Sequence, residues 1–564
     1  MSLVVQFVTK IRGFALEADG ASLKDWLQVE NDVPHIYYNM AQEIKSTFPD
    51  NGTDALEKFV DKCLPEEDDV QEGKGSPWPG FNSFIKDYLE YWRDVNFDDV
   101  VNVYTRLSEL LISCANALAN PTYGVMLLQT SMALSESLSK LVMSLTRQPE
   151  VLALIEGDET GDGESKSIVE MAADIIQKFF TSCLGDRSST RWAPPKGKKV
   201  AVYLFANLTL KLLFACEKSH LAVQMFTNLS TSGPALSLYP ASQRVTFLYY
   251  LGRFNFDNGH YFRAHMCLEE AYRQTHSQFL KHRRQILTYW IPSNILCGRF
   301  PSVALLSRPE AAGFAEIFLP ICAAVRTGNF VAFHAALNQN RDWLWDRGLY
   351  IVFLYRLKPL LWRSLTRKTF LLRSEMMRSS LEGGEGGDSN RAASLALEDV
   401  VVTAGYVQRL LEGYVPVNPA ARAKPAPAGV STVFMKAVNN NVVVPGQDGL
   451  LVPPPGGPRY LMPSEGLIFG NRKPDVESVE SVVAGLVYGG LLVGFIARQQ
   501  KRFAVEGAKK YGGNAVRAGW PEVYTALGQR FRESWEEGME AGDRGEGEPV
   551  GEFEECPGWV RDSS

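Results

Sequence analysis

The stretch from residue 244 to residue 302 constrains the fold more than any other part of this sequence. Apolar residues recur there at the three- and four-residue spacing of amphipathic helices, which predicts helices at about 245–254, 261–275 and 283–296. The turn sequence Asp257-Asn258-Gly259 separates the first two. Small residues stand where the first two helices would press together, at Gly252, Ala264 and Ala271. Since a helix pair of this kind cannot bury its apolar face alone, we expect it to stack on neighbouring helices in a solenoid.

Composition sets bounds but does not identify a function. The 564 residues are 45% hydrophobic and 22% charged, as in ordinary folded proteins, and the net charge of −6 is mild. A nucleic-acid partner would need a local basic face rather than a basic total. Eight cysteines are scattered without a CxxC pair and do not cluster with the seven histidines. We therefore expect buried reduced thiols, no metal site and no cofactor, rather than a zinc site or a disulfide framework.

The order of patterns predicts four regions. The expected regions are an N-terminal helical region at 1–180 with loops at 64–80 and 156–167, tetratricopeptide-like helical repeats at 181–340, a winged helix at 341–505 interrupted by a largely disordered insertion at about 379–474, and an acidic, mostly flexible tail at 506–564. In the first region we expect these core residues: Trp26, Leu27, Ile36, Tyr37 and Phe59. The predicted fold class is mainly α, a helical solenoid followed by a winged helix with a small β-hairpin.

The prediction of a β-hairpin comes from an apolar run that resembles a membrane-spanning helix in composition. Residues 481–497 fall short of the roughly 20 apolar residues that a spanning helix needs, and Gly489-Gly490 divides the run. The pattern favours a helix at 476–488, then strands at 492–497 and 502–505. Upstream, residues 348–370 are predicted to form one helix that is rich in aromatic and basic residues.

No catalytic signature is present. The sequence lacks a phosphate-binding glycine loop followed by Lys-Ser/Thr, an HExxH motif and a GxSxG motif, and the glycine-rich run at 382–387 is typical of a linker. The metal-binding histidine pair of isopeptidases is also missing. We expect a protein that is not an enzyme.

Several short motifs, in order and spacing, resemble the PCI-domain family. They are Ser182-Cys183-Leu184-Gly185-Asp186-Arg187, Tyr203 to Leu208, Tyr249-Tyr250-Leu251-Gly252-Arg253, Arg283 to Leu287, Ile291-Pro292, Gly298 to Ser302 and Gly348-Leu349-Tyr350. The likeness covers most of residues 1–375 and returns near 476–505. It implies a PCI-domain scaffold subunit of a nuclear complex that couples transcription to mRNA export. The same signature is shared with subunits named for the COP9 signalosome, a regulator of cullin–RING ligases through deneddylation, so this alternative stays open.

Basic residues of the predicted aromatic helix and wing are the candidate nucleic-acid contacts. They are Arg356, Lys358, Arg363, Arg367, Lys368, Arg373, Arg498, Lys501 and Arg502. A winged helix brings its helix and wing to one side, where Lys and Arg bind phosphates without sequence choice. The residues alone fit a solvated helix face equally well. The family resemblance favours binding of RNA and double-stranded DNA.

A second set is the candidate for partner binding. It comprises Lys281, Arg283, Arg284, Tyr289 and Trp290, although core packing is the ordinary role of such aromatic residues. The resemblance implies two partners, a large helical scaffold protein of the export complex and a small acidic subunit of the kind found in the proteasome lid. Signalosome subunits are the alternative partners, and no membrane is expected. The expected location is the nucleus, with the cytoplasm as a further compartment.

Overall fold

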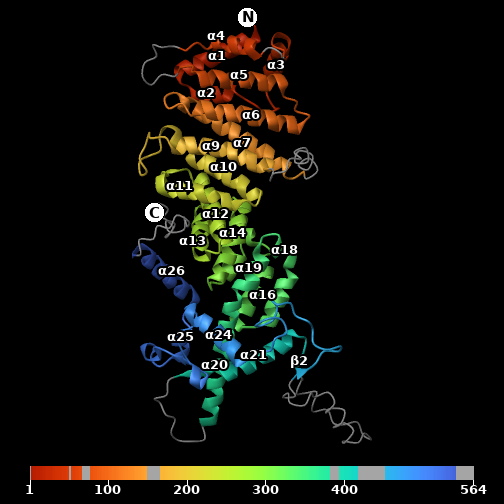
Figure 1. Ribbon diagram of the computed structural model, residues 1–564, viewed down its shortest axis with the longest axis vertical. Helices are drawn as coiled ribbons and strands as arrows, with labels where there is room; N and C mark the ends of the chain where they lie inside the picture. The colour runs from red at the N-terminus through yellow and green to blue at the C-terminus, as the bar shows by residue number, and fades with distance from the viewer. Residues whose placement is uncertain are drawn as a thin grey trace. The chain divides into compact units, whose positions relative to one another are not determined.

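The computed structural model describes residues 2–49, 53–66, 76–148, 166–381, 393–416 and 451–540, and these are mostly helical (Figure 1). The described residues of Met1–His276 form one compact unit, called unit 1 here, and those of Ser277–Asp543 form a second, unit 2. This division falls inside the region 181–340, which we expected to be one module of repeats. The two predicted loops lie largely outside the described residues, as do 382–392, 417–450 and 541–564.

Unit 1 contains only helices among its described elements. Its α-helices are α1 (Leu3–Glu17), α2 (Gly20–Trp26), α3 (His35–Thr47), α4 (Thr53–Cys63), α5 (Pro79–Asp94), α6 (Val100–Leu118), α7 (Leu128–Leu145), α9 (Ile168–Leu184), α10 (Val202–Ala215), α11 (Val223–Ser232), α12 (Ala241–Asp257) and α13 (Tyr261–Gln274), and its 3-10 helices are η2 (Gly124–Leu127), η3 (Gly197–Ala201), η4 (Ser219–Ala222) and η5 (Leu236–Leu238). Most helices pack on the next one in sequence. Leu27 and Tyr37 are buried as expected, but Ile36 is 42% exposed because it points away from the face of α3 that carries Tyr37.

The helix pair α12–α13 confirms the prediction from small residues. A Cβ atom added at Gly252 would lie 2.6 Å from Cγ of Leu268, so only glycine permits this close approach of the two helices. Ala264 and Ala271 are completely buried. Gly259 has a φ of +80° at the turn between the helices, a conformation that glycine adopts without strain.

Unit 2 begins with helices and ends in a winged helix. Its helices are α14 (Leu280–Leu296), α15 (Val303–Leu306), η6 (Pro309–Ala311), α16 (Phe314–Thr327), α17 (Phe330–Gln339), α18 (Arg341–Trp345), α19 (Leu349–Arg356), α20 (Lys358–Leu381), α21 (Leu397–Leu411), α24 (Val476–Tyr488), η7 (Arg498–Gln500), η8 (Ala508–Tyr511), α25 (Ala515–Gly519) and α26 (Val523–Glu540). The single helix expected at 348–370 is therefore wrong. Two helices meet at Leu357, because Pro359 has no N–H to bond back to the preceding turn.

The winged helix has a three-stranded antiparallel sheet rather than a hairpin alone. Strand β5 (Arg502–Val505) lies between β1 (Ser394–Ala396) and β4 (Gly494–Ala497), and Phe503 stands opposite both Leu395 and Ile496. Helices α20, α21 and α24 contact one another around this sheet. The chain order helix, strand, helix, helix, strand, strand and the sheet order β1-β5-β4 define a winged helix. The helix and both hairpin strands expected at 476–505 are confirmed.

The insertion expected at 379–474 needs correction. Strand β1 and helix α21 fall within it and are integral to the winged helix, because Leu395, Leu397 and Val400 are buried. A second small sheet pairs β2 (Val415–Pro416) with β3 (Leu451–Val452). The residues that remain outside the description, 382–392 and 417–450, thus flank α21 on both sides instead of forming one insertion.

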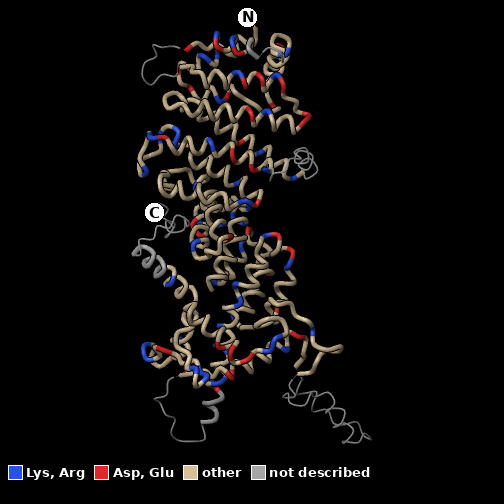
Figure 2. The backbone as a smooth tube through the Cα atoms, in the orientation of Figure 1, with Lys and Arg blue, Asp and Glu red and all other residues tan. Residues whose placement is uncertain are grey.

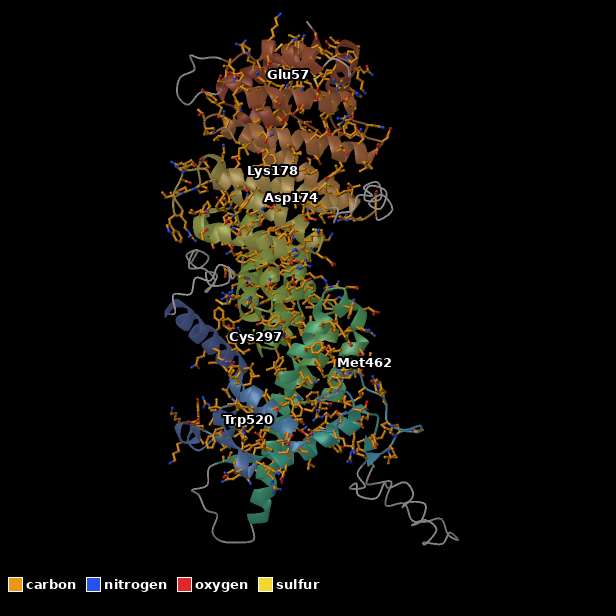
Figure 3. All side chains as sticks on the ribbon, in the orientation of Figure 1. Glu57, Asp174, Lys178, Cys297, Met462 and Trp520 are labelled. Carbon is orange, nitrogen blue, oxygen red and sulfur yellow. The ribbon has the colours of Figure 1, made fainter. Side chains whose placement is uncertain are left out.

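The tail expected from residue 506 onward is also partly structured. Trp520 is 5% exposed, and its ring lies 5.0 Å from that of Phe370 on α20 and 6.1 Å from that of Phe503 on β5 (Figure 3). Helix α26 starts against the turn at Gly298, where an added Cβ would lie 2.4 Å from the Val523 side chain. Residues 506–540 are therefore part of the folded unit.

The apolar run at 481–497 is divided between α24 and β4. Among the described helices, none is both long and apolar enough to cross a bilayer.

Candidate nucleic-acid interface

Two of the predicted basic contacts point into the fold. Lys358 Nζ donates to the carbonyl oxygen of Gly466 at 2.7 Å, and burial lowers the pKa of this ammonium group. Arg363 Nη2 donates to the carbonyl oxygens of Trp520 and Pro521, at 3.2 and 2.5 Å. Burial, with a smaller effect from the charge of Arg367, lowers the pKa of Arg363 to about 10. Both side chains hold segments of unit 2 together, so the candidate interface excludes them.

Three predicted contacts are exposed cations without an acidic partner among the described residues. Arg367 and Lys368 lie side by side on α20, and Arg356 is the last residue of α19. Their neighbours Phe370 and Leu365 are buried, so the helix turns its basic side outward. These groups are available to bind an anion from solvent.

The remaining predicted contacts are already paired within the winged helix. Arg373 Nε lies 3.4 Å from Asp399 Oδ2, Arg498 Nε lies 2.9 Å from Glu480 Oε1, and Lys501 Nζ lies 3.9 Å from Glu398 Oε1. Arg502 Nε donates to Ser394 Oγ at 3.1 Å. Exposed pairs contribute less than about 1 kcal/mol each, so a phosphate can compete with these carboxylates. The nearby acids nevertheless cancel most of the long-range attraction that the wing would exert.

Helix α24 is unlike a DNA-reading helix. The third helix of many winged-helix and helix-turn-helix proteins enters the major groove and needs groups that tolerate phosphate nearby. Residues 476–488 contain Glu477 and Glu480 but no Lys or Arg. An N-terminal capping box between Asp475 and Ser478 adds a further carboxylate at the start of the helix. Helix α24 therefore lacks the basic residues for contact with a nucleic acid.

A second basic cluster in unit 2 was not found from the sequence. Lys509, Lys510 and Arg517 are exposed around Tyr511, which is 47% exposed, and the Arg517 guanidinium lies 5.5 Å from the Tyr511 ring centre. The signal was present as GAKKYGGN, but these residues lay in the part interpreted as a flexible tail.

The predicted partner-binding residues are mostly structural. Arg283 Nε lies 3.1 Å from the buried carboxylate of Glu310. Arg284 donates to the carbonyl oxygens of Glu310 and Ala312 and lies over the Phe314 ring at 4.4 Å. Tyr289 is 7% exposed and Trp290 is half-buried, whereas Lys281 is exposed. Within this set only Lys281 is freely accessible, since the others pack within the described part of unit 2.

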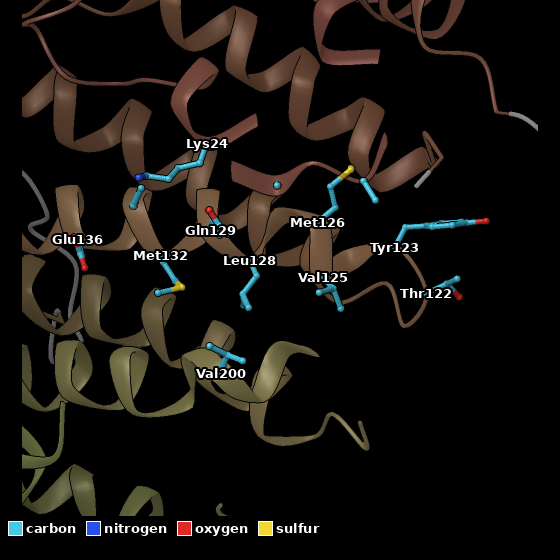
Figure 4. A pocket seen from close by; sticks show the side chains of 13 residues that line it. Lys24, Thr122, Tyr123, Val125, Met126, Leu128, Gln129, Met132, Glu136 and Val200 are labelled. Atoms are coloured by element: carbon cyan, nitrogen blue, oxygen red, sulfur yellow. The ribbon is translucent and has the colours of Figure 1, made fainter. Parts of the chain in front are cut away.

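Nothing in the described residues gathers into a catalytic centre. No group of three or more His, Cys, Asp or Glu residues is placed there to hold a metal ion. Burial raises the pKa of the Cys183, Cys297 and Cys322 thiols to about 12, so they stay protonated at neutral pH. A groove of about 720 Å³ in unit 1 is lined largely by apolar side chains such as Met126 and Val200, with Lys24 and Glu136 as its charged residues (Figure 4).

Helix-rich units, one of which ends in a winged helix, are consistent with a PCI-like fold. No family model matches the sequence. The chain is 31% identical over 235 residues to the Protein CSN12 homolog of Neurospora crassa, covering 41% of this chain and 50% of that protein. It is 30% identical over 212 residues to PCI domain-containing protein 2 of Xenopus laevis (38% and 51%) and 30% identical over 231 residues to the Protein CSN12 homolog of Schizosaccharomyces pombe (41% and 52%).

The chain thus spans about half the length of the curated relatives it matches. The likeness to these proteins supports a PCI-domain assignment.

Proposed function

We propose that this chain is a non-catalytic scaffold subunit of a nuclear complex that couples transcription to mRNA export, and that its winged helix contributes a surface for RNA or DNA. The observation that carries the proposal is the exposed pair Arg367 and Lys368 on α20, which has no acidic partner among the described residues. Its partners would be a long helical scaffold protein and a small acidic subunit.

The chemistry of this surface favours contact with the phosphate backbone. Cations on one helix face release counterions from the nucleic acid but carry no base recognition. The acidic helix α24 offers no means of reading a major groove. We therefore expect binding that depends strongly on salt and little on sequence.

The test is a titration of the full chain with labelled RNA and duplex DNA, comparing wild type with R367E/K368E. Each phosphate contact to a single strand changes the salt slope by about 0.7, so the double variant should lower the slope by more than about 1.4 and weaken binding at least tenfold. The matched control is K58E/K62E, which makes the same charge change on exposed positions of α4 in unit 1. Equal affinities for R367E/K368E and wild type would contradict the nucleic-acid role.

Membership of the COP9 signalosome is the second candidate function, and one observation favours it. The cations of the wing are paired with acids and α24 is acidic, which suits packing against other proteins better than binding to phosphate. Two of the relatives are also named CSN12 homolog. A tagged pull-down from nuclease-treated extract separates the two functions. Recovery of the export scaffold supports the first, and recovery of signalosome subunits supports the second.

A further inference from the structure

A tryptophan stands exposed on the loop between α9 and η3 in unit 1. Trp192 is 62% exposed, although large aromatic side chains are usually buried. The loop, residues 186–199, is called the Trp192 loop here. It carries five Lys or Arg residues and a single acid, Asp186. Figure 2 shows Lys and Arg crowded along this connection.

The loop is held in one shape by its only carboxylate. Asp186 accepts hydrogen bonds from the backbone N–H and hydroxyl of Ser188 and from the backbone N–H of Lys198. Gly197, with a φ of +56°, lets the chain pass close to this carboxylate, since an added Cβ would lie 2.7 Å from Asp186 Oδ2. The carboxylate of Asp186 is therefore engaged within the loop, where its charge acts on the neighbouring Lys198.

Two of the five cations are structural as well. Lys198 Nζ donates to the carbonyl oxygen of Asn120, and Lys199 Nζ donates to that of Ser189. The other three belong to the same loop as Trp192 and lie within five residues of it in the sequence. Arg187 and Lys196 are exposed, and the Arg191 guanidinium lies 5.7 Å from the centre of the Trp192 ring.

The surrounding sequence is also rich in Lys and Arg. Between residues 187 and 256 there are nine Lys or Arg residues and one acid, Glu217. The segment that touches the loop comes from the same stretch, because Ala235 N donates to the carbonyl oxygen of Arg191 and Arg191 Nη1 donates to that of Thr231. Some of these cations are engaged elsewhere, since Lys218 pairs with Glu170 and Arg244 donates to the carbonyl oxygens of Ser237 and Tyr239. The positive charge that an anion would meet at the loop is therefore that of its own exposed cations.

We propose that the Trp192 loop binds single-stranded nucleic acid, with one base stacked on Trp192 and the flanking phosphates on Arg187, Arg191 and Lys196. An aromatic side chain accompanied by cations is the means by which sequence-tolerant proteins hold single strands. A duplex keeps its base faces covered, so it offers Trp192 nothing to stack on. A protein hot spot would instead surround the tryptophan with apolar side chains, whereas the Arg191 guanidinium lies beside this ring and two more exposed cations stand in the same loop.

The experiment measures binding of the full chain to fluorescent oligouridine RNA, to oligothymidine DNA of equal length and to a duplex of the same DNA sequence. Since stacking of one base contributes about 1–3 kcal/mol, W192A should weaken single-strand binding about 5- to 150-fold, W192F less, and duplex binding should not change. R187Q/K196Q should lower the salt slope for single strands by about 1.4. Comparing RNA with DNA shows which strand the loop prefers.

Matched controls are W345A, which removes a tryptophan that is 56% exposed in unit 2, and K58Q/K62Q on α4. Both should bind single strands as wild type does. Wild-type affinity for single strands in W192A would overturn the proposal. An oligoglutamate peptide provides a second test. If the peptide displaces the RNA and its own binding is weakened equally by W192A, the loop binds acidic peptides and the proposal is overturned. The proposal shares no residue with the surface on α20. Loss of binding in R367E/K368E but not in W192A refutes this inference alone, and the reverse result refutes the winged-helix surface alone.

Discussion

Arg363 was predicted to bind nucleic acid, but the structure shows that its side chain makes an internal contact instead. Its guanidinium group links α20 to the carbonyl oxygens of Trp520 and Pro521. Hydrogen bonds to charged groups contribute about 1.5–3 kcal/mol each, so Arg363→Ala should destabilise the winged helix by about 3–5 kcal/mol. The exposed neighbour Arg367 makes no such bond among the described residues, so Arg367→Ala should change stability by less than about 0.5 kcal/mol.

Hydrogen exchange followed by mass spectrometry measures this difference locally. Peptides from α20, α25 and β5 should lose protection in Arg363→Ala and keep it in Arg367→Ala. Arg363→Lys should fall between them, because one ammonium group retains the charge but cannot reproduce the planar geometry of the guanidinium group. Equal protection in the alanine variants of Arg363 and Arg367 would refute the structural role given to Arg363.

The internal role of Arg363 affects the interpretation of binding experiments with charge-reversal variants. A charge reversal at Arg363 would remove an internal contact at the same time as a positive charge, so a loss of RNA binding in that variant would report unfolding. The variants at Arg367 and Lys368 change charge at exposed positions and therefore report on binding.

Two further predictions test the packing of each unit. In unit 1, Gly252→Ala should destabilise α12–α13, because overpacking against Leu268 costs about 1–3 kcal/mol and outweighs the gain in helix propensity. In a protein that already carries Leu268→Ala, the Gly252→Ala change should raise the free energy of unfolding by about 1 kcal/mol. If denaturant titrations show that Gly252→Ala still destabilises in that background, the contact between Gly252 and Leu268 is contradicted. In unit 2, Trp520→Ala should cost about 3–5 kcal/mol and expose the winged helix to limited proteolysis, and a protease-resistant variant would contradict the burial of Trp520.

The sequence was sufficient to predict elements that are determined by residues close together in the chain. Helices α13 and α24 agree with the prediction within a residue, since a regular apolar period ends in each case at a clear helix stop. The tight contact of Gly252 with Leu268 could also be expected, because small residues recur on the facing sides of the two helices.

Elements that depend on distant partners were not visible in the sequence. Strand β1 is three residues long, and it pairs with β5 more than a hundred residues later. Its neighbour α21 is different, since the sequence pattern indicates a helix at about 395–411. It stands between two stretches of biased composition, and only the fold shows that it belongs to the winged helix rather than to an insertion. Trp520 was placed in a flexible tail, because only the fold brings it against Phe370 and Phe503.

The same reason limits prediction of the candidate site. Lys358 and Arg363 look like their neighbours in a basic helix, but their acceptors lie 108 and 157 residues further along the chain. The pairing of Arg498 with Glu480 is likewise invisible to composition. The residue type identifies a cationic side chain, whereas only the fold shows whether that side chain already has a hydrogen-bond or ion-pair partner within the protein.

Because the exposed cations occur in several small sets, we expect each set to contribute only part of the affinity for a nucleic acid. Exposed cations on α20, around Tyr511 and on the Trp192 loop form three small sets, and each set supplies two or three cations. One such set alone gives weak, salt-sensitive attachment, since each single-strand phosphate contributes only about 0.7 to the salt slope. Within unit 2, the set on α20 and the set around Tyr511 raise the local concentration of the bound strand for one another. Loss of one set should therefore weaken binding in part, and only combined variants should remove it.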